Sequence, residues 1–246
     1  MSLRHGWVLG WISVIWFGWG SLQWADAGMI GPPIAVYPRG ALAVSIEGDM
    51  INRELALDTG DSPDITMIKF LSRGTYGVYN RTNIFLTLGM VDDDFRVLNY
   101  RGTELVFLSK QAITYGAGFK LTVYEGSNFL LGGGAQYERF TLDSEKSTDT
   151  SPSADAELSW QEARFFVGAQ VKEIPYFVPY GGLYLAKVRG ELDFSGFTLQ
   201  GTDVQESQSV GFFYGGNFQV WKKIFLNAEL HLIAETSVAF SIQYAF

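Results

Sequence analysis

The last ten residues constrain the fold of this chain more than any other stretch. Ser237–Phe246 reads SVAFSIQYAF, so large apolar side chains alternate with small or polar ones at every second position. Alternation with a period of two is typical of a β-strand with two unlike faces. One face is entirely apolar and ends in the aromatic residue Phe246. Such a strand needs an apolar environment on one side and partner strands beside it.

Composition narrows the class of protein that can carry such strands. The chain has 246 residues, of which 18% are charged and 15% aromatic, with 28 glycines and a net charge of −8. Helical membrane proteins contain apolar runs of about 18 residues or more, and none follows the amino-terminal region. The lack of a basic run argues against nucleic acid as a partner. No cysteine is present, which excludes disulfides, thiol catalysis and zinc–thiolate sites and fits an oxidising compartment.

The amino-terminal residues have the pattern of a secretory signal peptide. Arg4 precedes an apolar block from Gly6 to Trp24, and Ala25-Asp26-Ala27 is a small-x-small cleavage pattern. We therefore predict a signal peptide over residues 1–27, and its removal would leave 246 − 27 = 219 residues. An uncleaved membrane anchor is the alternative, because the apolar block is long for a signal peptide.

The residues after the predicted cleavage site divide into a short lead-in and one barrel domain. Three prolines that pair poorly in a sheet predict that residues 28–40 are a periplasmic lead-in, and the barrel covers residues 41–246. The alternation predicts an all-β fold, a transmembrane antiparallel up-and-down β-barrel of ten strands, with eight or twelve as alternatives. The first strand is expected to be interrupted near Asp49. The predicted strands are Ala41–Leu57, Thr66–Tyr79, Asn83–Val91, Ala112–Tyr124, Phe129–Leu142, Ser159–Lys172, Phe177–Phe194, Ser209–Trp221, Phe225–Ile233 and Ser237–Phe246.

The connections between these strands alternate in length. Short turn-like links such as Asn80-Arg81-Thr82 and Lys222-Lys223 are followed by longer ones such as Asp92–Gln111. Outer-membrane barrels have short periplasmic turns and longer extracellular loops. An even strand number then places both ends of the barrel in the periplasm. The sequence leaves open whether Asp92–Gln111 folds into the lumen or extends two strands above the membrane.

Charged residues share one face of several predicted strands. Lys187 and Arg189 alternate with apolar residues on Phe177–Phe194, and a basic side chain facing lipid at mid-bilayer costs about 2–4 kcal/mol. Charged residues on such faces are therefore predicted to point into the lumen and to pair there, because unpaired buried charge is costly. The predicted lumen charge network is Glu47, Lys69, Arg73, Lys120, Glu138, Glu162, Arg164, Lys187, Arg189, Glu191, Glu229 and His231. A soluble barrel with an apolar interior gives the same alternation and is the alternative.

Aromatic residues recur beside the short turns. The predicted interface aromatics are Tyr76, Tyr124, Phe129, Tyr176, Trp221, Phe225, Tyr244 and Phe246. Their placement is typical of the girdle at a membrane interface. Together with the stretches YGAGFK, LGGGAQY and the final YAF, this pattern resembles the small OmpA-like and OmpW-like group of bacterial outer-membrane barrels. The terminal Phe246, the predicted signal peptide and the placement of the aromatics favour a membrane barrel over a soluble one. The resemblance covers most of the chain after residue 27 and brings no catalytic residues with it.

Two motifs carry a hypothesis of enzymatic chemistry. Asp58-Thr59-Gly60 matches the DTG of aspartic proteases, but those enzymes need two such aspartates and the chain has one copy. His231, with Glu229 and with Ser237 or Ser241 on the neighbouring strand, could form a nucleophile–base–orienter set. A lumen-facing histidine hydrogen-bonded to Glu229 is the structural alternative.

Two further features are candidate binding sites, the acidic outer loops for cations and the triple glycine Gly132–Gly134, which lies within a predicted strand, for phosphate. Carboxylates suit Ca²⁺ or Mg²⁺, but their spacing is irregular, so a solvated face competes with divalent-cation binding. The loop acids are Asp58, Asp61, Asp64, Asp92, Asp93, Asp94, Asp143, Glu145, Asp149, Asp155, Asp203 and Glu206. No helix is predicted after the glycines, so they are not expected to bind phosphate as a loop before a helix does.

These observations together predict an integral outer-membrane barrel with a structural or surface-interaction role. A narrow channel for small solutes or ions is the first alternative, with selectivity set at Lys187, Arg189, Glu191 and Glu229. A lipid-modifying enzyme using His231 is the second. The expected partners are outer-membrane lipid and the barrel-assembly machinery, which would recognise the strand ending in Phe246. No cofactor and no metal site are expected beyond divalent cations at the acidic loops.

Overall fold

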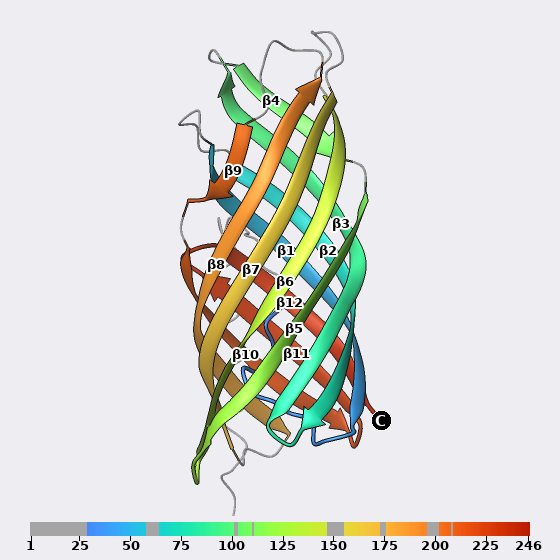
Figure 1. Cartoon of the computed structure of the whole chain (residues 1–246), viewed down its shortest axis with the longest axis vertical. Coiled ribbons are helices and arrows are strands. Elements are labelled where there is room, and N and C mark those ends of the chain that lie inside the picture. The colour runs from blue at the N-terminus through green and yellow to red at the C-terminus, as the bar shows by residue number, and fades with distance from the viewer. Residues whose placement is uncertain are drawn as a thin grey trace, which may run out of the picture.

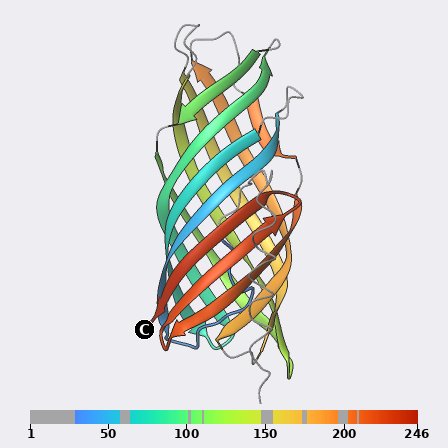
Figure 2. The same cartoon turned by 180° about the vertical axis from the view of Figure 1, so that it is seen from behind.

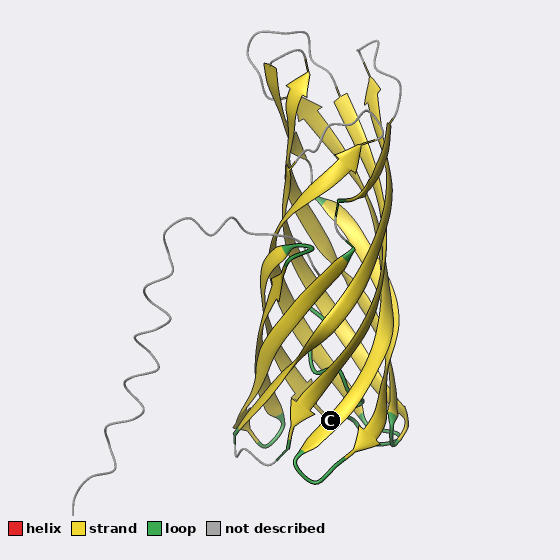
Figure 3. Cartoon of the chain, turned by 90° about the vertical axis from the view of Figure 1, so that its left-hand side faces the viewer, coloured by secondary structure: helices red, strands yellow, loops and turns green. Residues whose placement is uncertain are grey.

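The computed structural model describes residues 29–57, 64–100, 103–109, 111–146, 155–172, 176–195, 202–207 and 209–246. The described residues form strands and loops only (Figure 3). No helix among them is long and apolar enough to cross a membrane. The predicted signal peptide and the Asp58-Thr59-Gly60 motif lie outside these residues.

Ten antiparallel strands close into a barrel, as the sequence predicts. β12 returns to pair with β1, and β8 pairs with β10 (Figure 1). β1 runs without a break, because Asp49 lies opposite Lys69 on one side and Ala239 on the other, so the expected interruption near Asp49 is wrong. The ten strands are β1 (Leu42–Leu57), β2 (Asp64–Tyr79), β3 (Thr82–Tyr100), β5 (Ala112–Glu125), β6 (Phe129–Lys146), β7 (Asp155–Val171), β8 (Phe177–Ser195), β10 (Val210–Trp221), β11 (Ile224–Leu232) and β12 (Thr236–Ala245).

Two short strands extend the barrel at its loop end. β4 (Thr103–Ser109) lies between β3 and β6 beyond the end of β5, and β9 (Thr202–Glu206) lies between β8 and β1. The strands β10, β11 and β12 end well below this level (Figure 2). The barrel therefore changes from ten strands at the turn end to eight at the loop end, in the order β1-β2-β3-β4-β6-β7-β8-β9. The open question about Asp92–Gln111 is answered here, because β3 and β4 extend the wall upward.

An apolar belt covers the outside of the ten-strand section. Its side chains are exposed, by 67% on Ile46 of β1, 64% on Phe70 of β2 and 69% on Leu86 of β3. Phe240 and Ile242 of β12 continue the belt, as the closing stretch predicts. Monomeric soluble proteins rarely expose a contiguous apolar surface of this size. The wall of this section is therefore built to face lipid.

The two faces exchange character above the belt. On β8, Leu185 points outward within the belt, and the next outward residues are Lys187, Arg189 and Glu191, while Val188 between them is fully buried. The prediction that Lys187, Arg189 and Glu191 face the lumen is therefore wrong. Their strand continues beyond the membrane, where a charged outer face is solvated and lipid no longer dictates which side is polar.

The interior of the eight-strand section is a packed apolar core. Its buried side chains are Ile51, Leu55, Ile65, Met67, Val91, Phe140, Leu142, Leu158, Trp160, Val188, Leu192 and Val204. Phe140 and Trp160 stack with their ring centroids 5.7 Å apart and their planes at 11°. An eight-strand barrel has an interior that side chains can just fill. The loop-end section thus resembles a soluble barrel, because its interior is apolar and its outer face is polar. The ten-strand section has the opposite arrangement.

The predicted aromatics gather at the turn end of the belt. Tyr76, Tyr124, Tyr176, Trp221 and Phe246 are each at least 45% exposed. Tyr124 packs against Phe129, and Tyr244 against Phe246, with centroids 5.7 and 4.9 Å apart. Phe225, beside the last turn, is half-buried. This girdle is where the turn-end membrane interface is expected to lie.

Candidate functional site in the lumen

A segment of the chain fills the turn-end half of the lumen. Residues 29–35 are buried, although none of them belongs to a strand. We call Met29–Tyr37 the plug. As predicted, these residues stay outside the sheet. The predicted location as a periplasmic lead-in is wrong, because they lie inside the barrel and not beneath it.

Charged wall residues satisfy the backbone of the plug. The Glu229 carboxylate accepts the Ile30 and Gly31 N–H groups at 2.7 and 2.8 Å. Lys120 Nζ donates to the carbonyls of Ile30 and Pro32 at 2.5 and 3.0 Å. An extended segment without a strand partner must find such acceptors and donors when it is buried.

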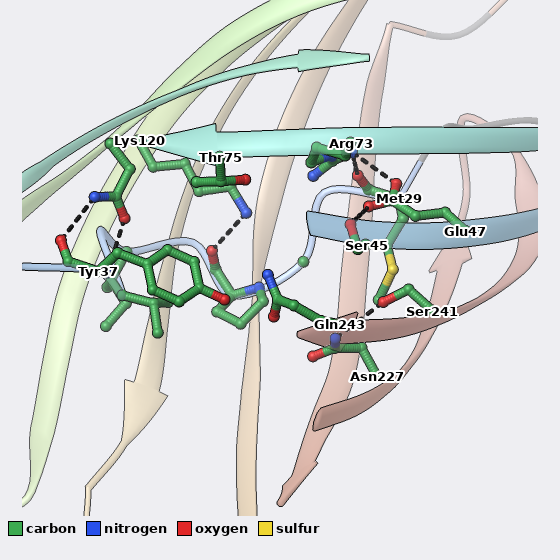
Figure 4. Close-up of a pocket in the computed structure, with 15 residues that line it drawn as sticks. Met29, Tyr37, Ser45, Glu47, Arg73, Thr75, Lys120, Asn227, Ser241 and Gln243 are labelled. Carbon is green, nitrogen blue, oxygen red and sulfur yellow. Dashed lines mark hydrogen bonds and ion pairs between the residues drawn. The ribbon is translucent and has the colours of Figure 1, made fainter. Parts of the chain in front are cut away.

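The contacts continue along the whole plug. Arg73 Nη2 donates to the Met29 carbonyl at 2.6 Å, and the Met29 N–H donates to Asp49 Oδ2 at 3.0 Å. At the turn end, the Asn83 amide exchanges two hydrogen bonds with the Tyr37 backbone, at 2.8 and 3.0 Å. Figure 4 shows Lys120, Arg73 and Glu47 converging on the plug from β5, β2 and β1. Side chains from opposite sides of the wall therefore hold one peptide between them.

Glycines on β6 and β7 make room for the plug. Gly132 and Gly168 are paired across the two strands. A Cβ on Gly132 would lie 2.8 Å from the Pro33 carbonyl oxygen, and one on Gly168 would lie 3.0 Å from Pro33 Cγ. The carbonyl oxygens of Leu121 and Gly181 on the neighbouring strands would lie even closer, at 2.4 and 2.5 Å. These inward glycines thus lie where the neighbouring strand and a proline-containing peptide both approach closely, a use of glycine typical within strands.

Above the plug lies a buried cluster of charges. Glu162 Oε1 accepts from Arg164 Nε at 2.6 Å and from Arg53 Nη2 at 3.1 Å. Glu235 also pairs with Arg53, and with Arg164 at 3.5 Å. Buried charges are tolerated when opposite signs and hydrogen bonds compensate them. This cluster forms the floor under the apolar core, where Arg53 Cζ lies 5.7 Å from the Trp160 ring centroid.

The described structure brings nine of the predicted lumen charges inside and leaves three outside. Lys69 Nζ lies 2.9 Å from Glu138 Oε1, and Arg73 Nη2 lies 3.0 Å from Glu47 Oε2. The nine inward residues are Glu47, Lys69, Arg73, Lys120, Glu138, Glu162, Arg164, Glu229 and His231. The three on the outer surface are Lys187, Arg189 and Glu191.

Sequence reasoning missed three inward charges, Asp49, Arg53 and Glu235. Asp49 and Arg53 share the face of Glu47, so the period-two pattern of β1 contained the signal for both. Glu235 carried no such signal, because it lies in the link between β11 and β12. In that link Ile233 has a φ of 83°, which β-branched residues rarely adopt.

His231 is held as part of the buried charge cluster. Nε2 lies 2.6 Å from Glu229 Oε1 and Nδ1 lies 2.9 Å from Glu235 Oε1. Both ring nitrogens therefore face carboxylates, and the ring is fully buried. Ser237 lies opposite His231 in the sheet, while Ser241 accepts a hydrogen bond from Asn227 at 2.9 Å. A general base needs a free nitrogen in reach of the nucleophile, and this geometry supplies none.

Two small cavities lie in the interior among the described residues. A cavity beside the plug, lined by Glu47, Arg73 and Lys120, measures about 40 Å³. Another between Arg73, Phe85 and Glu138 measures about 10 Å³. The described residues contain no group of three or more His, Asp or Glu side chains that could hold a metal. Of the acidic loop residues, Asp58, Asp61 and Asp149 lie outside the described residues.

Comparison with known proteins shows a likeness of fold. No family model and no curated protein sequence matches the chain. The translocator domain of the autotransporter NalP from Neisseria meningitidis is 14% identical, over 86% of this chain and 90% of that chain, with a TM-score of 0.51. The COG4313 outer membrane channel from Pseudomonas putida F1 is 13% identical, over 89% and 100%, with a TM-score of 0.46. Outer membrane protein OprG from Pseudomonas aeruginosa is 11% identical, over 85% and 97%, with a TM-score of 0.48.

Proposed function

We propose that this small outer-membrane β-barrel is a closed, non-enzymatic envelope protein whose lumen does not conduct. Its role is structural or lies at its loop end, which the eight-strand section would hold above the membrane. The packed apolar core of that section carries the proposal. If the plug left the lumen, only the turn-end half of the lumen would become free, and the charge cluster and the apolar core would still close the path.

A plugged channel is the second candidate, and one observation favours it. The plug is held by hydrogen bonds from side chains and not by pairing with a strand. A peptide held in this way can leave without breaking the barrel ladder. In that case transport would begin when the plug is released, and the neighbouring charges Lys120 and Glu229 would line the opened path.

Planar-bilayer conductance of two proteins separates these candidates. One is the signal-free chain and the other lacks residues 29–37. The closed barrel predicts silence from both, with folding verified by the shift of the unboiled band in a detergent gel. Stepped currents from the deletion variant would overturn the proposal in favour of the plugged channel.

A milder variant covers the case in which the deletion does not fold. Glu229→Gln together with Lys120→Met removes the two side chains that bind the plug between Ile30 and Pro32, and keeps the barrel length and strand pattern. The closed barrel again predicts no current from a folded sample. Currents from this variant would also contradict the proposal.

A further inference from the structure

The outer surface of β6, β7 and β8 carries a row of cationic and amide side chains at the upper edge of the belt. These strands run side by side across the front of the barrel in Figure 1. Arg139 lies opposite Gln161, and Gln161 lies opposite Arg189. All three are exposed, and neighbouring strands are about 4.8 Å apart. The two guanidinium groups therefore flank one point on the surface.

No carboxylate shares this row. The next outward residue above Arg189 is Glu191, and the lysine below it, Lys187, donates to Glu206 at 3.1 Å. Among the described residues, Arg139 and Arg189 have no ion-pair partner. Paired arginines with free forks suit phosphate oxygens, because guanidinium and phosphate bind in a bidentate manner.

A groove lies in the belt below the same row, and its upper end at Phe165 and Leu185 is four residues below Gln161 and Arg189. Gly133 and Ala135 are the outward residues of β6 at this depth, and they are flanked by larger side chains on both neighbouring strands. The groove measures about 550 Å³ and has almost entirely apolar walls, from Phe119 and Leu121 on β5, Phe165 and Val167 on β7, and Leu183 and Leu185 on β8.

The height between the arginine row and Gly133 in the groove fits one leaflet. Gly133 lies six residues below Arg139 on β6, or about 20 Å along a strand that rises about 3.3 Å per residue. At a tilt of about 40° this is about 15 Å along the membrane normal, half of a hydrocarbon core about 30 Å thick. An acyl chain that descends from a headgroup at the row and lies in the groove would thus end near the middle of the bilayer.

We propose that this face binds one lipid of the outer leaflet that carries an anionic phosphate headgroup. The phosphate lies between Arg139 and Arg189, with Gln161 beside it, and an acyl chain lies in the groove over Gly133. The opposite wall offers no equivalent, because the outward residues at the same edge of β1 and β3 are Asn52, Glu54 and Asp92. The site goes beyond the closed-lumen function and does not depend on it.

The test uses phosphatidic acid as the probe and phosphatidylcholine with the same acyl chains as the reference lipid. Native mass spectrometry of the full folded barrel in detergent counts retained lipid. The wild-type protein is expected to retain phosphatidic acid at least tenfold more tightly than phosphatidylcholine. Each cation near an anionic lipid surface is worth about a factor of five, so Arg139→Gln with Arg189→Gln is expected to weaken retention about 25-fold.

Two further variants make the result specific. Arg81→Gln with Lys222→Gln removes two exposed positive charges at the turn end and is expected to leave retention unchanged. Val167→Trp narrows the groove and is expected to weaken phosphatidic acid retention about tenfold while the preference over phosphatidylcholine persists. Equal retention of the two lipids, or equal loss in the turn-end and loop-end charge variants, would overturn the proposal.

Discussion

At the scale of single residues, Glu229 connects the wall, the plug and the charge cluster. One oxygen accepts from Ile30 and lies 2.6 Å from His231 Nε2, and the other accepts from Gly31. A fully buried carboxylate is costly unless it is paired and hydrogen-bonded. The backbone N–H groups of the plug therefore offset part of the cost of burying Glu229, and wall and plug depend on each other for stability.

Glu206 makes the attachment of β9 dependent on pH. Burial would raise the pKa of Glu206, but hydrogen bonds from backbone N–H groups, Lys187 and Ser209 outweigh it and hold that pKa below the usual 4.5. A carboxyl whose pKa is lowered by folding stabilises the fold above its unfolded pKa, and this stabilisation is lost as the pH falls through the folded pKa. We expect protease cleavage near β9 to accelerate as the pH is lowered below about 4.5. Glu206→Gln should be cleaved equally fast above and below that pH. If this variant kept the pH dependence of the wild-type protein, Glu206 would not be the group responsible.

At the scale of single strands, the exchange of faces above the belt makes the effect of a charge depend on depth. Phe70 and Thr66 both point outward on β2, four residues apart. A lysine at mid-membrane on the lipid face costs about 2–4 kcal/mol, so Phe70→Lys should lower the free energy of unfolding by about that amount. Thr66→Lys lies beyond the belt and should change it by less than about 0.5 kcal/mol. Urea unfolding in phospholipid vesicles measures both, and equal losses would mean that the belt boundary on β2 is misplaced.

The strands were predictable from the sequence at the turn end and much less so at the loop end. The short turns and period-two alternation placed the turn-end limits within about two residues, as for β5, predicted as Ala112–Tyr124 and found as Ala112–Glu125. The loop-end limits were missed on β3, which continues nine residues past Val91 to Tyr100. Above the membrane a strand no longer needs an apolar outer face. The period of two persists there, but the apolar residues point inward and the polar residues point outward.

The interior could be predicted only as far as the pattern of one strand reaches. Inward charges on β5, β7 and β11 followed from alternation, because each strand has one clearly apolar face. The plug did not follow, because its prolines predicted only that it avoids the sheet and gave no information on where it lies. Its position depends on glycines and charges from distant strands, such as Gly132 and Glu229, which only the closed barrel brings together.

At the scale of the whole molecule, the change from ten to eight strands and the closure of the lumen have one cause. β10, β11 and β12 end at mid-height, and only β9 continues the wall between β8 and β1. Fewer strands make a narrower barrel, and the narrow section can be filled by side chains from its own walls. The wider section cannot be closed by its wall alone, and there the plug and the charge cluster fill the space.

The orientation of the molecule can be tested with single cysteines, because the chain has none of its own. Glu191→Cys lies on the outer face above the belt, and Ser127→Cys lies in the short turn between β5 and β6. If the loop end faces the outside, a membrane-impermeant thiol reagent should label Glu191→Cys on intact cells and should label Ser127→Cys only after the envelope is broken. Leu185→Cys, six residues below Glu191 on the same face, should stay unlabelled in both cases, since thiolates do not form in lipid and the thiolate is the reactive species. Labelling of Ser127→Cys on intact cells would reverse the orientation, and labelling of Leu185→Cys would move the membrane boundary on β8 below the level at which Arg139 and Arg189 are placed here.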